Sequence, residues 1–170
     1  AKQTETTQRF KVHLLTSAEE DLFTKVEFSR RGFNGERAVQ SVSDTILRAY
    51  KLSPLLCPHY GADSAVSQKI EALAMRSAVQ ARDVFDLYIL IPQAQVIARN
   101  EVTKQSKTSF SALAEKAREN ALEISFEQFR DTVVSYLADE DRSVYDKTAA
   151  WDEIKLRVSD FLERAGKGNA

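Results

Sequence analysis

The C-terminal two-thirds of the chain has apolar residues at helical spacing. Between residues 66 and 91 they recur every three or four positions, as on the buried face of an amphipathic helix. Three further segments with this period follow, at 109–123, 125–137 and 148–165. The second of these opens with Ser-Phe-Glu-Gln, in which Ser125 and Gln128 match a capping box. We therefore predict a largely helical C-terminal part.

The first third of the chain has the alternation of β-strands. FKVHLL at 10–15 and LFTKVEFS at 22–29 are rich in β-branched and aromatic residues, which predicts a hairpin with a loop of about six residues. Residues 1–8 are expected to form a flexible lead-in, and residues 39–61 are compatible with a strand, a helix or both. Two strands alone are marginally stable in water, so we expect helices or further strands to cover them.

The predicted fold class is α+β, with short N-terminal antiparallel strands packed on a mainly helical C-terminal bundle. We expect residues 1–62 to form the β-containing part and residues 63–170 the helical part. No internal repeats or low-complexity tracts interrupt either part, and residues 100–108 have the composition of a linker.

The apolar stretch at 69–90 also contains charged residues, four of which could form a site. Lys69 and Arg76 lie beside its apolar stripe, and Asp83 and Asp86 share one helix face. In an unbroken helix, Lys69 and Asp83 would be about 21 Å apart at 1.5 Å per residue. They can share a site only if the chain turns between about 77 and 82. We therefore predict a helical hairpin whose second helix begins at the end of that turn, where an Asp is electrostatically favoured.

Composition narrows the range of partners and compartments. The 170 residues suffice for one domain, and the net charge of −1 gives no general attraction to nucleic acid or anionic membrane, so any RNA contact must be local. The single cysteine, Cys57, excludes an internal disulfide and lies in an apolar context that predicts a buried, inert thiol. Because there is no signal peptide and no apolar run of about 20 residues, we expect a cytoplasmic protein without a membrane partner.

The order of residue types from 69 to 90 is more specific than an amphipathic hairpin requires. It resembles the C-terminal signature of the AbiEii/AbiGii nucleotidyltransferase toxins, bacterial proteins of abortive infection and toxin–antitoxin systems. The matching residues are Lys69, Ala72, Leu73, Arg76, Arg82, Asp83, Phe85, Asp86, Leu87 and Leu90. The resemblance covers approximately residues 20–165, and beyond 66–90 it is carried by the helical pattern.

The resemblance implies a polymerase-β-like nucleotidyltransferase. Such a protein transfers a nucleotide from an NTP to an acceptor, which for some relatives is RNA such as tRNA, with Mg²⁺ assistance and inhibition by an antitoxin protein. This chain has neither the family's early Gly-Ser or Gly-Gly motif nor a strand-borne Asp-x-Asp. We therefore expect it to be the C-terminal portion of such a toxin and inactive by itself.

The resemblance also implies roles for five residues. Lys69 would bind the nucleotide phosphates, with Arg76 beside it, and Asp83 would orient Lys69 or transfer a proton. Asp86 is a further catalytic candidate, and Glu27 matches a position where an acidic residue on the metal side is often found. Each has a structural alternative: a lysine at the rim of the core, an arginine–aspartate ion pair, a carboxylate that pins the helix, or a solvent-facing strand residue.

Other polar residues give weaker signals. Arg30, Arg31 and Arg37 bracket a Gly-containing loop that we interpret as a solvated turn, or else as a local phosphate or RNA contact. His13 and His59 have no spacing typical of a metal pair and are minor catalytic candidates. The competing hypothesis for the whole chain is a non-enzymatic helical interaction module in which the four charges form a structural network.

Overall fold

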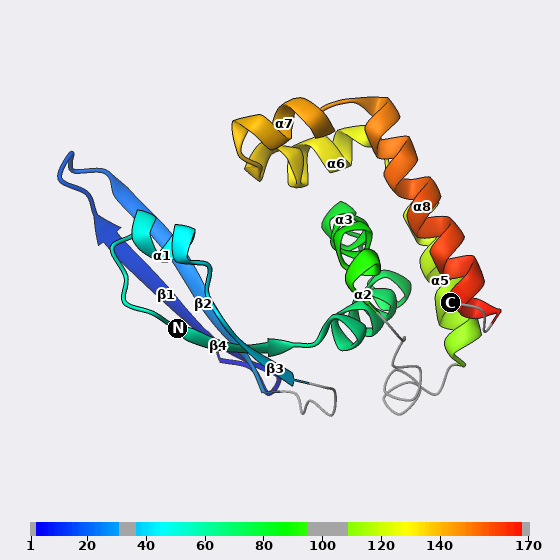
Figure 1. The fold of residues 1–170 in the computed structure, drawn as a ribbon, viewed down its shortest axis with the longest axis horizontal. Coiled ribbons are helices and arrows are strands. Elements are labelled where there is room, and N and C mark those ends of the chain that lie inside the picture. The colour runs from blue at the N-terminus through cyan, green and yellow to red at the C-terminus, as the bar shows by residue number, and fades with distance from the viewer. Residues whose placement is uncertain (1–2, 31–36, 95–108, 168–170) are drawn as a thin grey trace. The chain divides into compact units, whose positions relative to one another are not determined.

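The computed structural model describes residues 3–30, 37–94 and 109–167 (Figure 1). Its class is α+β, as predicted, and the chain divides into two compact units, Ala1–Asn34 and Gly35–Ala170. The first unit contains a β-hairpin. The second contains a two-stranded sheet followed by helices.

The hairpin consists of β1 (Thr7–Leu15) and β2 (Asp21–Ser29), paired antiparallel from Thr7 opposite Ser29 to Leu15 opposite Asp21. Both strands were predicted. β1 begins earlier than expected, because Thr7 and Gln8 already pair with β2. The lead-in expected over residues 1–8 is therefore shorter than the sequence suggested.

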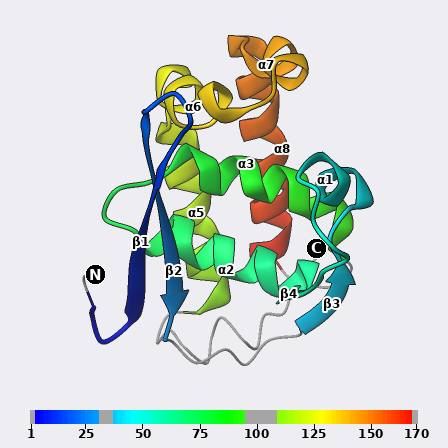
Figure 2. The ribbon, with the colours of Figure 1, turned by 90° about the vertical axis from the view of Figure 1, so that its left-hand side faces the viewer.

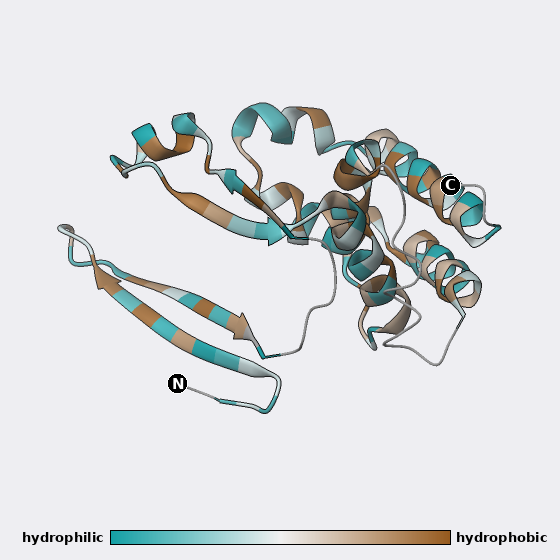
Figure 3. Cartoon of the chain, turned by 60° about the horizontal axis from the view of Figure 1, so that its bottom comes forward, coloured by the Kyte–Doolittle hydropathy of each residue, from teal (hydrophilic) through white to brown (hydrophobic). Residues whose placement is uncertain are grey.

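The two faces of the hairpin differ in chemistry, as the alternating colours of its strands indicate (Figure 3). Directly opposed residues share a face, and so do residues two apart along a strand. One face is apolar and its side chains are exposed. It carries Phe10, Val12, Leu14, Leu22, Val26 and Phe28. The other face is mainly polar. It carries four cross-strand pairs: Arg9 with Glu27, Lys11 with Lys25, His13 with Phe23, and Leu15 with Asp21.

Residues 37–60 form a second two-stranded antiparallel sheet. It pairs β3 (Arg37–Ser41) with β4 (Leu56–Tyr60), and α1 (Asp44–Ala49) lies between them in sequence. Pro58 is tolerated in β4 because a two-stranded sheet has only edge strands. The prediction of a buried Cys57 is wrong: it is exposed in β4, since its apolar neighbours belong to a strand with a single partner.

The predicted helical hairpin is confirmed. It consists of α2 (Ala62–Met75) and α3 (Ala81–Leu90). The turn between them lies close to the range predicted from Lys69 and Asp83. A single 3₁₀ turn, η1 (Ile91–Gln93), continues α3. The two helices cross in front of α5 and α8 in the view of Figure 2.

Four more helices and a 3₁₀ turn lie between residues 109 and 167. They are α5 (Phe110–Glu123), α6 (Phe126–Thr132), η2 (Val134–Tyr136), α7 (Asp139–Tyr145) and α8 (Thr148–Gly166). The capping box is confirmed, since the Gln128 backbone N–H donates to Ser125 Oγ at 3.2 Å and the Ser125 backbone N–H donates to Gln128 Oε1 at 2.9 Å. No helix in the described part of the chain is long and apolar enough to cross a membrane.

The segment predicted as one helix over 125–137 is shorter than expected. α6 ends at Thr132, and a 3₁₀ turn replaces its last turn. α7 was not predicted from the sequence. Its first turn is acidic, and it has no fully buried residue. A helix without a buried face gives no apolar periodicity, which explains the omission.

The core of the second unit lies where α5 and α8 run side by side and α2 and α3 pack against them (Figures 1 and 2). At its α6 end, the rings of Phe129 and Trp151 stack with centroids 4.3 Å apart and planes 11° apart. Trp151 Nε1 donates to the Ile124 carbonyl at 3.1 Å. This buried bond joins α8 to the α5–α6 connection.

Replacing Phe129 with Ala should destabilise the protein by about 3–5 kcal/mol, because it leaves a cavity against Trp151. Urea denaturation followed by circular dichroism measures the change. Tyr136→Ala is the control: this tyrosine is 84% exposed, and its removal should change the free energy of unfolding by no more than about 0.5 kcal/mol. Equal effects of the two substitutions would contradict the described packing.

Candidate functional site

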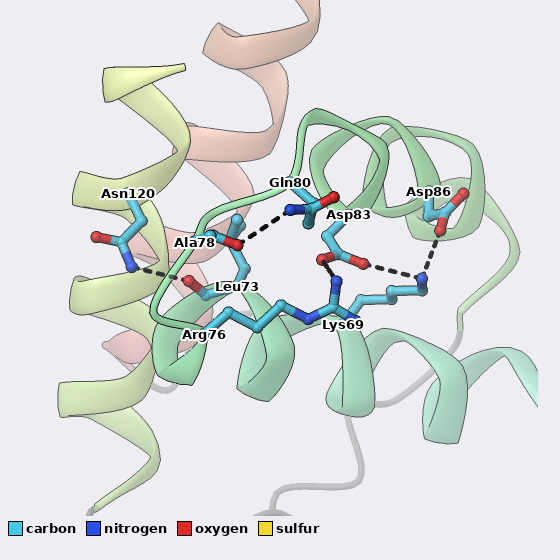
Figure 4. Close-up of polar contacts among 8 residues, drawn as sticks. All are labelled: Lys69, Leu73, Arg76, Ala78, Gln80, Asp83, Asp86 and Asn120. Atoms are coloured by element: carbon cyan, nitrogen blue, oxygen red, sulfur yellow. Dashed lines mark hydrogen bonds and ion pairs between the residues drawn. The ribbon is translucent and has the colours of Figure 1, made fainter. Parts of the chain in front are cut away.

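The turn between α2 and α3 is held by backbone geometry and by one distant side chain. Arg76 and Gln80, at its two ends, are both extended, which ends one helix and allows the next to begin. Asn120 of α5 donates from Nδ2 to the Leu73 carbonyl at 2.8 Å (Figure 4). Because this bond satisfies a carbonyl in the last turn of α2, it fixes the end of the hairpin to the core.

Asp83 lies at the centre of the site. It is in the first turn of α3 and is fully buried. Lys69 Nζ lies 3.1 Å from Oδ1, and Arg76 Nη1 lies 2.9 Å from Oδ2 (Figure 4). The turn has therefore brought together two residues that one continuous helix would separate by about 21 Å. Arg82, the other arginine considered as a partner, is exposed.

The two oxygens of Asp83 are satisfied unequally. Lys69 donates a hydrogen bond to Oδ1, whereas Oδ2 has no hydrogen-bond partner among the described residues. The 2.9 Å contact from Arg76 to Oδ2 is thus a close ion pair without an aligned N–H. The buried Asp83 carboxylate is therefore stabilised mainly by Coulombic attraction to Lys69 and Arg76, and less by hydrogen bonds.

Lys69 is shared between two carboxylates. Its Nζ lies 2.5 Å from Asp86 Oδ2, in addition to its bond with Asp83. The side chains of Lys69 and Asp86 are 30% and 42% exposed, whereas that of Asp83 is not exposed at all. Lys69 thus has a buried partner that holds it and a partly exposed partner that a ligand could replace.

The arrangement can bind an anion more readily than a cation. An ammonium has three donors and a guanidinium has five, and the Lys69 and Arg76 side chains are both partly exposed. The two carboxylates, in contrast, are already neutralised by these cations. Within the described residues there is no group of three or more His, Cys, Asp or Glu that could hold a metal ion. In this arrangement Asp83 and Asp86 are both paired with cations, so they would have to exchange partners to bind Mg²⁺, and Mg²⁺ binding stays a prediction.

The remaining carboxylate candidate, Glu27, lies in β2. Its Oε1 accepts from Arg9 Nε at 2.5 Å, and the pair is partly exposed. Glu27 belongs to the first compact unit and the four clustered residues belong to the second. Its role on the metal side stays a prediction.

The weaker candidates have ordinary structural contacts. His13 Nε2 lies 2.5 Å from Asp21 Oδ1. His59 lies in β4 rather than in the expected loop, with Nδ1 2.7 Å from its neighbour's carbonyl oxygen. Arg30 donates to Gln3 Oε1 at 3.0 Å. Arg37 begins β3, and Arg31 lies outside the described residues, so the proposed anion-binding loop stays a prediction.

Two further features were not anticipated from the sequence. Asn120 is one, because no local pattern indicates which carbonyl a distant amide will reach. The other is Asp139-Glu140-Asp141, the chain's own Asp-x-Asp, which lies in the first turn of α7. It is therefore not the strand-borne pair that metal binding in the resembled family uses.

A cavity of about 470 Å³ lies elsewhere in the second unit. It is lined by Tyr88, Ile89, Ile91, Pro92, Tyr145, Arg157, Asp160, Phe161 and Arg164. Burial raises the pKa of Tyr145, and the neighbouring Tyr88 and Asp141 add to this increase. None of the four clustered residues lines this cavity, and the side chains of Lys69, Arg76 and Asp86 are partly exposed.

Comparison of the chain with protein-family models, curated proteins and solved structures finds no match. The family resemblance is therefore not tested by these comparisons and stays a prediction.

A double-mutant cycle should detect the central pair. Lys69→Met and Asp83→Asn should each lower the free energy of unfolding by about 1–3 kcal/mol, because each removes a partner from a buried polar contact. The double variant should lose less than the sum, with a coupling energy of about 0.5–3 kcal/mol. Urea denaturation measures all four proteins.

The matched control is the exposed pair Lys116 and Glu119, whose Nζ–Oε2 distance is also 3.1 Å. The same cycle with Lys116→Met and Glu119→Gln should give a coupling energy below about 0.5 kcal/mol. Equal coupling in the two cycles would show that the burial of Asp83 has no energetic consequence.

Proposed function

We propose that this chain is part of a nucleotidyltransferase similar to the AbiEii/AbiGii toxins, and that its α2–α3 hairpin binds the phosphates of a nucleoside triphosphate. The observation that carries the proposal is the fully buried Asp83, which holds Lys69 and Arg76 at the edge of the hairpin. In the intact protein the acceptor would be RNA such as tRNA, and an antitoxin protein would inhibit the transfer.

The cost of burying Asp83 supports a functional role. Replacing a buried ion pair by apolar residues of similar volume is often neutral or stabilising, so stability alone does not require a charge here. A carboxylate that holds two cations in fixed positions has an additional effect. It pre-organises positive charge for an anionic ligand.

Asp86 gives Lys69 a way to exchange partners. In the free protein Lys69 contacts both Asp83 and Asp86. An incoming phosphate oxygen can replace the partly exposed Asp86, while the buried Asp83 keeps the ammonium in place. Lys69 would then offset negative charge on the phosphates, and Arg76 would add a second cation on the other side of Asp83.

The chain would bind nucleotide without completing the transfer. Mg²⁺ would supply charge neutralisation between phosphates in the intact enzyme, but Asp83 and Asp86 are paired with cations in the present arrangement. This sequence also has neither the Gly motif nor a strand-borne Asp-x-Asp. Its contribution to the reaction would therefore be to bind and orient the phosphates.

The alternative is a helical interaction module with no enzymatic role. The observation that favours it is the complete pairing of the cluster, in which two cations and two carboxylates balance. In that case Asp86 would stabilise the hairpin, and its neutralisation would weaken the fold without any gain in anion binding.

The two proposals predict opposite effects of Asp86→Asn. If Lys69 binds phosphate, removing its competitor should strengthen NTP binding, by about threefold or more for a change of roughly 0.7 kcal/mol. Lys69→Ala and Asp83→Asn should both weaken binding at least about tenfold. Isothermal titration calorimetry with NTP and Mg²⁺ measures all three, and circular dichroism checks that each variant is folded.

Lys116→Ala is the matched control, because it removes a surface lysine that contacts one carboxylate outside the hairpin. It should bind NTP as the wild type does. Absence of wild-type binding, or weaker binding by Asp86→Asn together with reduced stability, would favour the structural network instead.

The purified chain of 170 residues should not transfer nucleotides. Incubation with labelled NTP, Mg²⁺ and tRNA should give no labelled acceptor above that obtained with the Lys69→Ala variant. Efficient Mg²⁺-dependent labelling by the wild type would contradict this expectation and show that the chain contains a complete active site.

A further inference from the structure

The polar face of the β1–β2 hairpin combines cations with an exposed aromatic ring. We define the basic–aromatic face as Arg9, Lys11, His13, Phe23 and Lys25, which lie at alternate positions of the two strands. Three consecutive cross-strand rows make it up. They pair Arg9 with Glu27, Lys11 with Lys25, and His13 with Phe23.

The middle row of this face places two lysines directly opposite each other. Like charges in directly opposed positions destabilise an antiparallel pair. Lys11 and Lys25 are both exposed, and neither has an ion pair or a side-chain hydrogen bond within the described residues 3–30, 37–94 and 109–167. The row therefore has two uncompensated positive charges. They are expected to lower the stability of the hairpin, so stability does not account for their presence.

The next row presents a flat aromatic surface. Phe23 is 72% exposed, and its ring stacks on that of His13 with centroids 4.8 Å apart and planes 15° apart. His13 is in turn held by Asp21, with Nε2 2.5 Å from Oδ1. The phenyl ring is thus supported on one side and leaves its other surface available for stacking.

The third row, Arg9 opposite Glu27, adds no uncompensated charge to the basic–aromatic face. Arg9 is already paired with Glu27 at 2.5 Å, so the uncompensated charge is concentrated at Lys11 and Lys25. Rows on one face of a strand repeat about every 7 Å. An anionic group at the lysines and a planar group on Phe23 would therefore lie one row apart.

We propose that the basic–aromatic face binds single-stranded nucleic acid, with phosphate at Lys11 and Lys25 and a base stacked on Phe23. Phosphates contact basic side chains and unpaired bases stack on aromatic rings in such complexes. A duplex conceals the faces of its bases, and an acidic peptide would use the lysines without the ring. The inference uses residues of the first unit only, so it does not depend on the proposed nucleotidyl transfer.

The test measures binding of a fluorescein-labelled 12-nucleotide oligouridine to the full chain by fluorescence anisotropy at low salt. Lys11→Gln with Lys25→Gln should weaken binding about tenfold and reduce the salt dependence of log K by about 1.4, or about 0.7 for each lysine. Phe23→Ala should also weaken binding about tenfold, because it removes the stacking surface.

The controls match each change in size and charge. Lys116→Gln with Lys167→Gln removes two exposed lysines of the second unit, and Tyr136→Ala removes an aromatic ring that is 84% exposed. Both should bind the oligonucleotide as the wild type does.

Lys25→Glu separates binding from folding. It places opposite charges across the strands and so should maintain or increase the stability of the hairpin, while binding falls at least about tenfold. The proposal is overturned if the wild type does not bind, if Lys25→Glu or Phe23→Ala binds as tightly as the wild type, or if duplex RNA competes as well as unlabelled oligouridine.

Discussion

The buried carboxylate of Asp83 is the constraint on which the α2–α3 hairpin depends. It lies on one helix while its two cationic partners lie on or just after the other. In the closed hairpin only one oxygen of this carboxylate accepts a hydrogen bond. Opening the hairpin would separate Asp83 from both cations and remove that bond as well. The positions of Lys69 and Arg76 are therefore coupled to the angle between the helices.

Asn120 extends this constraint to the rest of the second unit. Its bond to the Leu73 carbonyl connects α5 with the last turn of α2, one turn before Arg76. α5 packs in turn along α8. The charged cluster thus lies on a rigid framework, although the cluster itself is partly exposed, and this combination suits pre-organised binding as well as structural cross-linking.

Periodicity predicted the elements that bury a face and failed where no face is buried. α2, α3, α5, α8 and both strands of the hairpin were predicted, since each has a regular apolar stripe or alternation. α7 was missed because it has no fully buried residue, and the exposure of Cys57 was mispredicted because its strand lies in a sheet of only two strands. Hydropathy indicates which residues favour burial, but not whether another layer is available to cover them.

The charged cluster was predictable as a set, but its pairing was not. Helical rise required a turn if Lys69 and Asp83 were to meet, whereas the choice of Arg76 over Arg82 depends on the path of the turn. The lysine row of the hairpin was equally hidden, because only the strand register places Lys11 opposite Lys25. A shift of one residue would have turned one strand's side chains to the other face.

The chain has a single tryptophan, and it lies in the core of the second unit against Phe129. Its intrinsic emission will therefore respond to melting of the helices and not to melting of the hairpin, which contains no indole. Backbone signals of the β1–β2 hairpin and the indole signal of the helical unit therefore report on different compact units. Whether they change together will reveal if the two compact units unfold as one cooperative system or as two.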